Sequence, residues 1–351
     1  MSESWLVFDP YLASSGGGER YMFALVTAVA ECGKRVVIAG PNADLPKLRS
    51  FGFPEAEVRP MTTWGFVGAS RRFRTTVSLS NHPPPPSLAR HAVVVVQFPF
   101  TGLSSNPLRR LVERWMLRRS HFVVYSEFAR GWLRERWGVH AVVLPPPVEL
   151  GDYRVELKRR VILNVGRFFP SQHSKRQDAL VAAFAALPAE ARAGWRLVLA
   201  GGVADDPASQ AYVADVRRKA DGLHVEVVAN VDAAALRALY AQATLYWHAT
   251  GLDRDEDEPE KAEHFGMTTV EAMSYGAVPV VIDDGGQPEI VTAATGVLWR
   301  DRADLVAESA ALMRDRGRCD VLARAASLEA RRFGPEAFRR GVAELVGRVG
   351  A

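Results

Sequence analysis

The chain of 351 residues is poor in cysteine and has no long apolar segment. Cys32 and Cys319 are its only cysteines, and their wide separation argues against a disulfide framework and is typical of a reducing compartment. The longest strongly apolar run, residues 92–96, is far shorter than the roughly 20 residues of a membrane helix. Residues 1–9 carry acidic side chains and show no secretory signal pattern. These absences predict a cytoplasmic protein.

Neither sign of charge dominates, because 44 Lys and Arg residues stand against 40 Asp and Glu residues, for a net charge of +4. A balance this mild gives no indication of nucleic-acid binding. The hydrophobic share of 48% and the charged share of 24% are those of globular proteins, which excludes disordered and collagen-like chains. A chain of this length is expected to form two domains.

Short apolar runs alternate with amphipathic segments along both halves of the chain, which predicts parallel sheets covered by helices. Pro145, Pro146 and Pro147 interrupt the pattern, and the polar stretch up to Arg160 is expected to be an interdomain linker. We predict an α/β fold of two Rossmann-like doubly wound domains, residues 1–150 and 151–333, facing across a cleft. A C-terminal helix within residues 334–351 is expected to cross back to the N-terminal domain.

The expected strands are residues 4–8, 35–39, 75–79, 92–97, 121–125 and 141–144 in the first half, and 161–165, 195–200, 224–228, 244–247, 278–282 and 296–299 in the second. The expected helices are 19–31, 107–119, 127–137, 175–187, 208–221, 233–242, 268–275, 302–316, 320–332 and 335–346.

Two glutamates, Glu263 and Glu271, flank the predicted start of a helix near Gly266. The first N–H groups of a helix have no backbone partner and lie at its positive end, so they can hold hydroxyl or phosphate oxygens. A carboxylate can accept two hydrogen bonds from the adjacent hydroxyls of a sugar or ribose. Such a spacing is common, however, and by itself it also fits an ordinary surface helix.

Arg167 and Lys175 follow the first strand of the second domain, so they are expected at its carboxyl end. Such cations can bind a phosphate or another anion at that edge of the sheet, although arginine is abundant in this sequence and Arg167 alone also fits an ordinary surface residue. In the first domain, Gly16, Gly17 and Gly18 predict a turn between the first strand and the first helix. A backbone without Cβ atoms can approach a phosphate or a sugar closely there.

These segments together resemble the retaining enzymes of glycosyltransferase family 4, which have the GT-B fold. The segment HFGMTTVEAMSYGAVPVV, with Glu263 before it and Glu271 within it, is similar to the family's E-x7-E signature. Residues 165–168, VGRF, followed by Lys175, resemble its phosphate-binding element. Residues 15–20, SGGGER, resemble the glycine-rich loop of the mannosyltransferases that extend lipid-linked oligosaccharides. The resemblance spans most of the chain in the family's order.

The resemblance implies a role for each of these residues. Glu271 would accept the ribose hydroxyls of the nucleotide, Glu263 would hold the transferred sugar, and Arg167 with Lys175 would neutralise the diphosphate. Backbone N–H groups of Phe265, Gly266 and Met267 would assist Glu263. Gly285 and Gly286 would approach the sugar or diphosphate, and the strand end at Asn230 would face the base. The glycine loop, Gly16, Gly17 and Gly18, would also contribute to the donor side.

One position departs from the family pattern. Gln97, in Gln97-Phe98-Pro99, stands where related enzymes commonly carry a histidine, and His82 at a neighbouring strand end is a candidate substitute. Glutamine cannot titrate, so a general base at this place is in doubt. In front-face retaining transfer the leaving diphosphate itself helps to take the acceptor's proton, so activity need not depend on a histidine.

No metal and no cofactor beyond the donor are expected. The motif Asp253-Arg254-Asp255 belongs to an acidic run that extends to Glu260 and is typical of a solvated loop. The cationic pair, Arg167 and Lys175, already supplies the neutralisation that a metal would provide.

The sequence therefore predicts retaining transfer of a hexose from a nucleotide-diphosphate sugar, with GDP-mannose favoured, to a glycan or glycolipid acceptor. Aromatic and basic residues interleave within 64–74 and 109–119, which favours peripheral contact with anionic lipids at the inner face of the membrane. No nucleic-acid partner is expected. The alternatives are a nucleotide-sugar epimerase of the same fold, a sugar phosphorylase, or a non-catalytic nucleotide-sugar-binding subunit, for which Gln97 is the main support.

Overall fold

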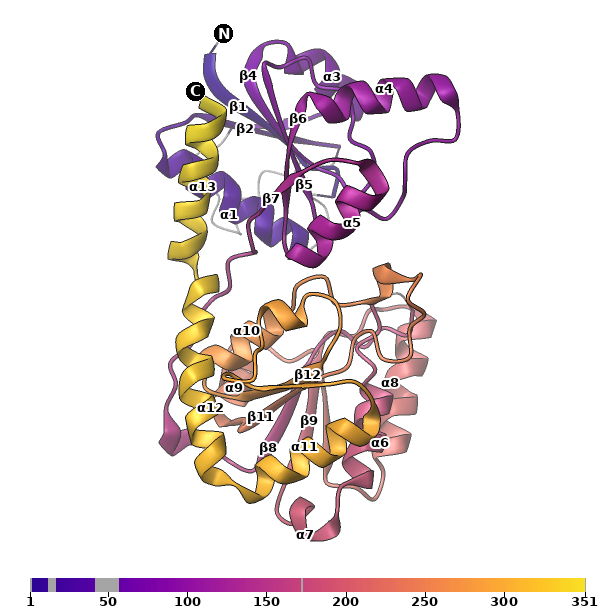
Figure 1. Cartoon of the computed structure of the whole chain (residues 1–351), viewed down its shortest axis with the longest axis vertical. Coiled ribbons are helices and arrows are strands. Elements are labelled where there is room, and N and C mark those ends of the chain that lie inside the picture. The colour runs from indigo at the N-terminus through magenta and orange to yellow at the C-terminus, as the bar shows by residue number, and fades with distance from the viewer. Residues whose placement is uncertain (1, 12–16, 42–56, 172, 351) are drawn as a thin grey trace. The chain divides into compact units, whose positions relative to one another are not determined.

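The computed structural model describes residues 2–11, 17–41, 57–171 and 173–350. It divides into two compact units, one formed by Met1–Pro147 with Pro335–Ala351 and the other by Val148–Gly334. The sequence predicts these boundaries at residues 150 and 333. Each unit has one parallel sheet with helices packed on it (Figure 1). Among the described residues, no helix has both the length and the hydropathy to cross a bilayer.

Unit 1 contains a seven-stranded sheet in the order β3-β2-β1-β4-β5-β6-β7, in which all neighbours are parallel. Its central strands are continuous runs of valine and other apolar residues, as required where helices cover both faces. The edge strand β3 and helix α3 were not among the expected elements; β3, EVRP, is short and polar and gives no apolar signal. The strands are β1 (Ser2–Phe8), β2 (Val36–Gly40), β3 (Glu57–Pro60), β4 (Phe73–Leu79), β5 (His91–Val96), β6 (Ser120–Val124) and β7 (Ala141–Val143).

The helices of unit 1 are α1 (Gly17–Glu31), α3 (Thr63–Ser70), α4 (Pro107–Arg118), α5 (Glu127–Trp137) and α13 (Pro335–Gly350). The last of these packs on the first. The Phe338 ring meets Tyr21 edge-on at 5.2 Å between centroids, and Arg339 pairs with Glu31 at 3.3 Å. The C-terminal helix therefore belongs to the unit that contains the N-terminal strand.

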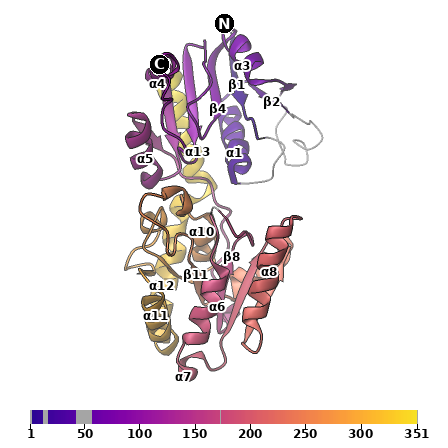
Figure 2. The ribbon, with the colours of Figure 1, turned by 90° about the vertical axis from the view of Figure 1, so that its right-hand side faces the viewer.

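Unit 2 contains a six-stranded parallel sheet in the order β10-β9-β8-β11-β12-β13. Helix α6 (Gln177–Ala186) packs against both α8 (Pro207–Ala220) and α11 (Arg302–Arg314), whereas α12 (Arg316–Glu329) packs against α10 (Met267–Ser274); Figure 2 shows α8 and α11 toward opposite ends of the sheet. Trp247 and Trp299 are fully buried in its core. The strands are β8 (Val161–Val165), β9 (Arg196–Gly201), β10 (Val225–Ala229), β11 (Leu245–His248), β12 (Val278–Ile282) and β13 (Val297–Trp299).

The helices of unit 2 are α6 (Gln177–Ala186), α7 (Ala189–Arg192), α8 (Pro207–Ala220), α9 (Ala233–Gln242), α10 (Met267–Ser274), α11 (Arg302–Arg314) and α12 (Arg316–Glu329). The described residues of unit 2 also form four short 3-10 helices: η1 (Val155–Leu157), η2 (Pro259–Lys261), η3 (Gln287–Glu289) and η4 (Ala330–Phe333).

The segment after the three prolines is not a free linker, contrary to the prediction from the sequence. It belongs to unit 2 and lies against that unit's sheet and helices. The ring of Tyr153 covers Gly276, where a Cβ would come within 2.2 Å of the ring, and the Gly151 N–H donates to Ser274 Oγ at 2.9 Å. Proline interrupts regular structure, but the side chains after it still pack.

Candidate active site

The predicted donor-side residues of unit 2 gather at the carboxyl edge of its sheet. Arg167 and Lys175 follow β8, and Glu263 lies in the connection between β11 and α10. Strands β8 and β11 are parallel neighbours, so their carboxyl ends lie at the same edge. This is where sheets of this kind bind ligands.

Lys175 and Glu263 form the centre of the site. Lys175 Nζ lies 2.5 Å from Glu263 Oε2, and both side chains are largely buried, at 19% and 16% exposed. His248, at the end of β11 and 1% exposed, lies with Nε2 at 2.9 Å from the same carboxylate oxygen. Thr250 Oγ1 also contacts His248 Nε2 at 3.2 Å. The same oxygen, Glu263 Oε2, therefore contacts both the Lys175 ammonium group and the His248 imidazole.

The electrostatics of this cluster favour an ionised Glu263. Burial alone would raise the pKa of Glu263, but the Lys175 charge and the His248 hydrogen bond outweigh it and hold that pKa well below its ordinary value of 4.5. Burial lowers the pKa of His248, although Glu263 opposes that shift. We infer that His248 is neutral and donates its Nε2 proton, because an ionised carboxylate can only accept.

Glycines allow the backbone to close around this pair. A Cβ on Gly166 would lie 2.5 Å from Lys175 Cγ, so the lysine stem crosses the β8 loop directly over that glycine. Gly285, at φ +63°, would bring a Cβ within 2.2 Å of the Glu263 carbonyl oxygen, and the Gly286 N–H donates to that oxygen at 2.7 Å. Gly285 and Gly286 thus support the backbone that carries Glu263.

The start of α10 is open in the way the sequence predicts. Gly266 is its N-cap, at φ 112°, and no described side chain caps the helix. A Cβ on Gly266 would come within 2.6 Å of Gln287 Nε2, so only glycine fits here. Phe265 is buried against Phe333, with 5.4 Å between ring centroids, and anchors the loop. The helix start at Met267 therefore offers backbone N–H groups beside Glu263.

Glu271 lies within α10 and is held by a tyrosine. The Tyr240 hydroxyl donates to Glu271 Oε2 at 2.6 Å, and the Tyr240 ring stacks on Tyr275 at 5.7 Å between centroids. Burial raises the pKa of Tyr246, and the charges of both Glu263 and Glu271 add to that shift. Both glutamates therefore lie within electrostatic reach of one buried phenol.

Arg167 is exposed, and among the described residues no acid pairs with it. Its guanidinium lies 6.0 Å from the centre of the Phe169 ring. Burial lowers the pKa of His173, and the charges of Lys175 and Arg167 contribute to that shift, although Glu263 opposes it. Arg167 is thus close enough to act on the cluster electrostatically while its own charge stays uncompensated.

Asn230 shapes the end of β10. Its backbone is left-handed, at φ 55°, and its Oδ1 accepts the Val203 N–H at 2.9 Å. The side chain oxygen is therefore used within the unit, while the residue itself remains exposed at the carboxyl edge.

The glycine loop of unit 1 differs from the prediction. Gly16 lies outside the described residues, and Gly17 and Gly18 form the first turn of α1 instead of a separate turn. A Cβ on Gly18 would lie 2.3 Å from Gln97 Nε2, so a larger residue here would have to displace the Gln97 amide. Gly18 therefore leaves room for that amide beside the first turn of α1.

Gln97 and His82 occupy different surroundings. Gln97 accepts from Asn81 Nδ2 at 3.1 Å and donates from Nε2 to the Tyr125 hydroxyl at 3.3 Å, which fixes its amide at the end of β5. His82 is exposed, with Nδ1 at 3.0 Å from Thr101 Oγ1. The glutamine is therefore firmly positioned, and the histidine lies in the loop next to Asn81.

The acidic segment after β11 is held by arginines. Asp253 pairs with Arg176 at 3.1 Å, and Arg254 pairs with Asp284. Within the described ranges, no group of three or more His, Cys, Asp or Glu side chains is placed to hold a metal ion.

Several residues of this site were not predicted, chiefly His248 and Tyr240. His248 directly follows the expected strand 244–247 and is the last residue of β11, which is a usable signal because polar residues at that edge face the ligand site. Tyr240 lies in an ordinary amphipathic helix, and nothing in its local sequence indicates that it reaches Glu271.

Comparisons with known proteins identify the family and the fold of the chain. The model of the family "Glycosyl transferases group 1" matches residues 150–328, and that of "Glycosyltransferase Family 4" matches residues 15–152. Comparison with curated protein sequences gave no match.

Solved structures share the fold over nearly the whole chain. Sucrose-phosphate synthase from Thermosynechococcus elongatus has a TM-score of 0.74 at 17% identity, with 99% of each chain covered. Anabaena HepE in complex with UDP has a TM-score of 0.75 at 17% identity, covering 98% of this chain and 100% of that one. A glycosyltransferase from Rickettsia africae has a TM-score of 0.71 at 14% identity, covering 99% and 98%. The predicted GT-B fold, with two Rossmann-like domains, is confirmed.

Proposed function

Because this chain belongs to the glycosyl transferases group 1, we propose that it transfers a hexosyl group, with retention of configuration, from a nucleoside-diphosphate sugar. The donor binds at the carboxyl edge of unit 2. The observation that carries the proposal is the buried contact of Lys175 and His248 with Glu263, beside the open start of α10 and near Glu271.

Each group has a chemical task under this proposal. Arg167, Lys175 and the first N–H groups of α10 stabilise the diphosphate as its charge develops. Glu263 accepts hydrogen bonds from the sugar, and Glu271 accepts them from the ribose. The bond between the anomeric carbon and the phosphate oxygen breaks, the bond to the acceptor oxygen forms on the same face, and the acceptor proton passes to the departing diphosphate. No metal takes part, so turnover persists in EDTA.

Two donors are favoured by different observations. The resemblance of residues 15–20 to lipid-linked mannosyltransferases favours GDP-mannose. The Anabaena HepE structures contain UDP, or UDP-glucose, which favours a uridine donor. We therefore propose that the donor is either a GDP-hexose or a UDP-hexose.

A thermal-shift panel of UDP, GDP, dTDP and ADP tests this proposal, because a ligand that binds the folded state raises the melting temperature. We expect UDP or GDP to raise the melting temperature of the protein most. When the corresponding sugar nucleotide is incubated with the protein and acceptor, we expect that nucleoside diphosphate to be formed. Absence of stabilisation by all four, together with no nucleotide release, would contradict the proposal.

Replacement of Arg167 by alanine is expected to lower turnover by about 100-fold, because an unpaired charge facing the leaving group is lost. The melting temperature should stay near that of the wild type, since Arg167 is exposed and has no ion-pair partner among the described residues. The matched control is Arg302→Ala, an exposed arginine on α11. Equal turnover in both variants would remove Arg167 from the site.

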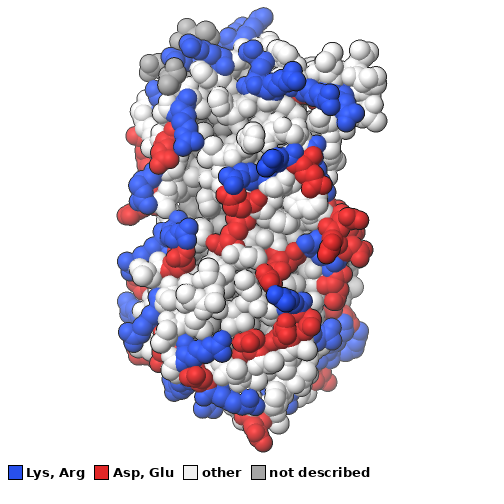
Figure 3. All heavy atoms as spheres, in the orientation of Figure 1, with Lys and Arg blue, Asp and Glu red and all other residues white. Residues whose placement is uncertain are grey.

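We propose that an exposed face of α4 contacts the acceptor side of the reaction. Leu108, Leu111, Val112 and Trp115 recur at the spacing of one helix face and are 76%, 67%, 51% and 48% exposed. Arginines flank them, and Figure 3 shows a run of basic side chains beside uncharged surface where Figure 1 labels α4. An apolar stripe with basic flanks fits an anionic lipid surface, so we propose a lipid-linked acceptor.

The other half of the predicted basic and aromatic patch is corrected by the structure. Phe66 and Phe73 are buried core residues, at 1% and 8% exposed, and cannot contact lipid. Trp64, 80% exposed, is the aromatic residue of that segment left at the surface.

The double variant L111E/W115E is expected to abolish flotation with vesicles that contain anionic lipid, because charge replaces the apolar stripe. Wild-type binding should weaken at high salt. The control is Leu328→Glu on α12, which changes a leucine that is 65% exposed. Binding that survives in the double variant, or that the control loses equally, would contradict this role of α4.

A further inference from the structure

A pocket lies at the edge of the unit 2 sheet opposite the candidate active site. Several of its lining residues come directly before strands: Lys158 and Arg160 before β8, Trp195 before β9, and Thr244 before β11. Its volume is about 270 Å³, close to the lower end of the roughly 300–1,000 Å³ typical of small-molecule sites. It is thus separate in the fold from Glu263 and Glu271.

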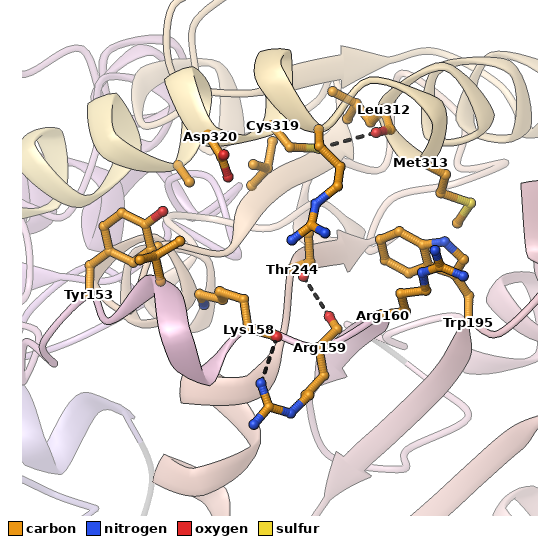
Figure 4. Close-up of a pocket in the computed structure, with 15 residues that line it drawn as sticks. Tyr153, Lys158, Arg159, Arg160, Trp195, Thr244, Leu312, Met313, Cys319 and Asp320 are labelled. Carbon is orange, nitrogen blue, oxygen red and sulfur yellow. Dashed lines mark hydrogen bonds between the residues drawn. The ribbon is translucent and has the colours of Figure 1, made fainter.

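The walls of this pocket are aromatic and apolar. Figure 4 shows Trp195 with Arg160 on one side, and Tyr153 with Lys158 and Asp320 on the other. The apolar lining includes Val278, Leu312, Met313, Cys319 and Ala323. Two aromatic rings facing one space suit a flat apolar group.

The polar part of the lining is strongly cationic. Four basic side chains line the pocket with a single carboxylate, Asp320. Arg159 is occupied by the carbonyls of Glu156 and Lys158, both at 2.9 Å. Arg160 Nη1 donates to the Ala193 carbonyl at 3.3 Å. Across the described ranges, no acid pairs with Lys158, Arg160 or Arg316.

Arg316 is not explained by the stability of its helix. It is the first residue of α12, where a positive charge meets the positive end of the helix dipole. The cap there is already supplied by Asp315, whose side chain accepts the Arg318 N–H at 2.8 Å. Arg316 therefore adds an exposed positive charge to the pocket without stabilising the start of its helix.

The pocket is linked to the ribose-side glutamate by direct contacts. Lys158 Nζ donates to the Ala243 carbonyl at 2.6 Å and lies 3.5 Å from the Tyr240 carbonyl, at the C-terminus of α9. The hydroxyl of Tyr240 in turn donates to Glu271. The Lys158 ammonium also lies 5.8 Å from the centre of the Tyr153 ring. Burial lowers the pKa of Lys158 to about 7, so a nearby anion would favour its charged form.

We propose that this pocket binds a small organic anion with a flat apolar body, and that the bound anion weakens nucleotide binding through Lys158 and Tyr240. The anion draws the Lys158 ammonium from the end of α9, which loosens Tyr240 and its hold on Glu271. The effect of the anion on nucleotide binding rests on the proposed function, whereas the binding of the anion does not. By thermodynamic linkage, a bound nucleotide weakens the binding of the anion by the same factor.

Isothermal titration of the full chain with indole-3-carboxylate and with indole-3-carboxamide tests the site. The two probes share one ring, which Trp195 and Tyr153 can accept, and differ in charge. We expect the carboxylate to bind at least tenfold more tightly than the amide, and Arg316→Gln to remove that preference. Arg302→Gln, outside the pocket, should keep it. Equal affinity for the two probes, no binding of the carboxylate, or an unchanged Arg316→Gln variant would overturn the proposed site.

The affinity for UDP or GDP, whichever binds, measured with and without saturating indole-3-carboxylate tests the coupling. We expect the anion to weaken the nucleotide at least threefold in the wild type and to have no effect in Tyr240→Phe, which lacks the hydroxyl contact. An unchanged or higher nucleotide affinity in the wild type would overturn the coupling. If neither nucleotide binds while the probe does, the proposed function fails and the anion site stands.

Discussion

Replacement of Glu263 by glutamine is expected to lower turnover by about 100- to 1,000-fold, the effect of removing one strong transition-state contact. The amide keeps the shape of the side chain but loses the charge that Lys175 and His248 share. Lys175 would then lie beside a neutral group, and the sugar would lose a charged acceptor. Steady-state kinetics with the donor identified by the nucleotide panel measures the effect.

The control for this variant is Glu258→Gln, which removes a carboxylate from the same connection between β11 and α10. Glu258 pairs with Lys261 and lies outside the buried cluster. It should leave turnover within about twofold, as surface substitutions generally do. Turnover of Glu263→Gln equal to that of the control would mean that the Lys175–Glu263 pair is structural and that the reaction occurs elsewhere.

Replacement of Lys175 by methionine is expected to cost both activity and stability. Turnover should fall by about 100-fold, because the leaving diphosphate loses its buried cation. Stability at pH 7 should fall by about 3 kcal/mol, the lower end of the range for a broken buried pair, since both partners retain some exposure. Chemical denaturation measures the stability, and methionine preserves most of the side-chain volume.

The loss of stability should depend on pH in a definite direction. In the wild type the folded pKa of Glu263 is held below 4.5, so its ionisation stabilises the fold above that pH and is lost as the pH falls through the folded pKa. Without Lys175, burial raises the folded pKa, and the charged form opposes folding at pH 7. The gap between variant and wild type should therefore narrow as the pH is lowered toward 4.

Lys219→Met is the matched control, because Lys219 pairs with Asp215 on the surface and is 47% exposed. Lys219 lowers the pKa of Asp215 from its ordinary value of 3.8, so the small effect of this variant should change only below about pH 4 and not between pH 7 and pH 4. A gap for Lys175→Met that is constant between pH 7 and pH 4 would show that Glu263 is not ionised against Lys175.

The fold was largely predictable from the sequence because parallel strands of buried sheets are continuous apolar runs. Most strands of both units carry that signal, although the edge strand β10, VEVVA, is only partly buried and contains a glutamate. The edge strand β3 lacks it, since a partly exposed edge tolerates EVRP. The packing of residues 148–160 was also hidden, because it depends on Tyr153 meeting a glycine more than a hundred residues later.

The site was predictable where a residue type has few other uses. Gly166 and Gly266 lie where a Cβ would clash with a neighbouring side chain, and Gly266 also has a positive φ angle. The residues next to them in the sequence are among the proposed ligand groups. The contacts of Tyr240 with Glu271 and of His248 with Glu263 join different elements, so no local spacing indicates them. The departure at Gln97 from the family's histidine could be read from the sequence. The hydrogen bond that holds its amide and its closeness to Gly18 could not, because they join residues far apart in the chain.

Hydrogen–deuterium exchange of the full chain, with and without the best-binding nucleoside diphosphate, tests the location of the donor site most directly. The account predicts slower exchange in residues 166–177 and 263–275, which contain the proposed phosphate and ribose contacts. Protection confined to unit 1, or to the opposite edge of the unit 2 sheet, with these two segments unchanged, would contradict it.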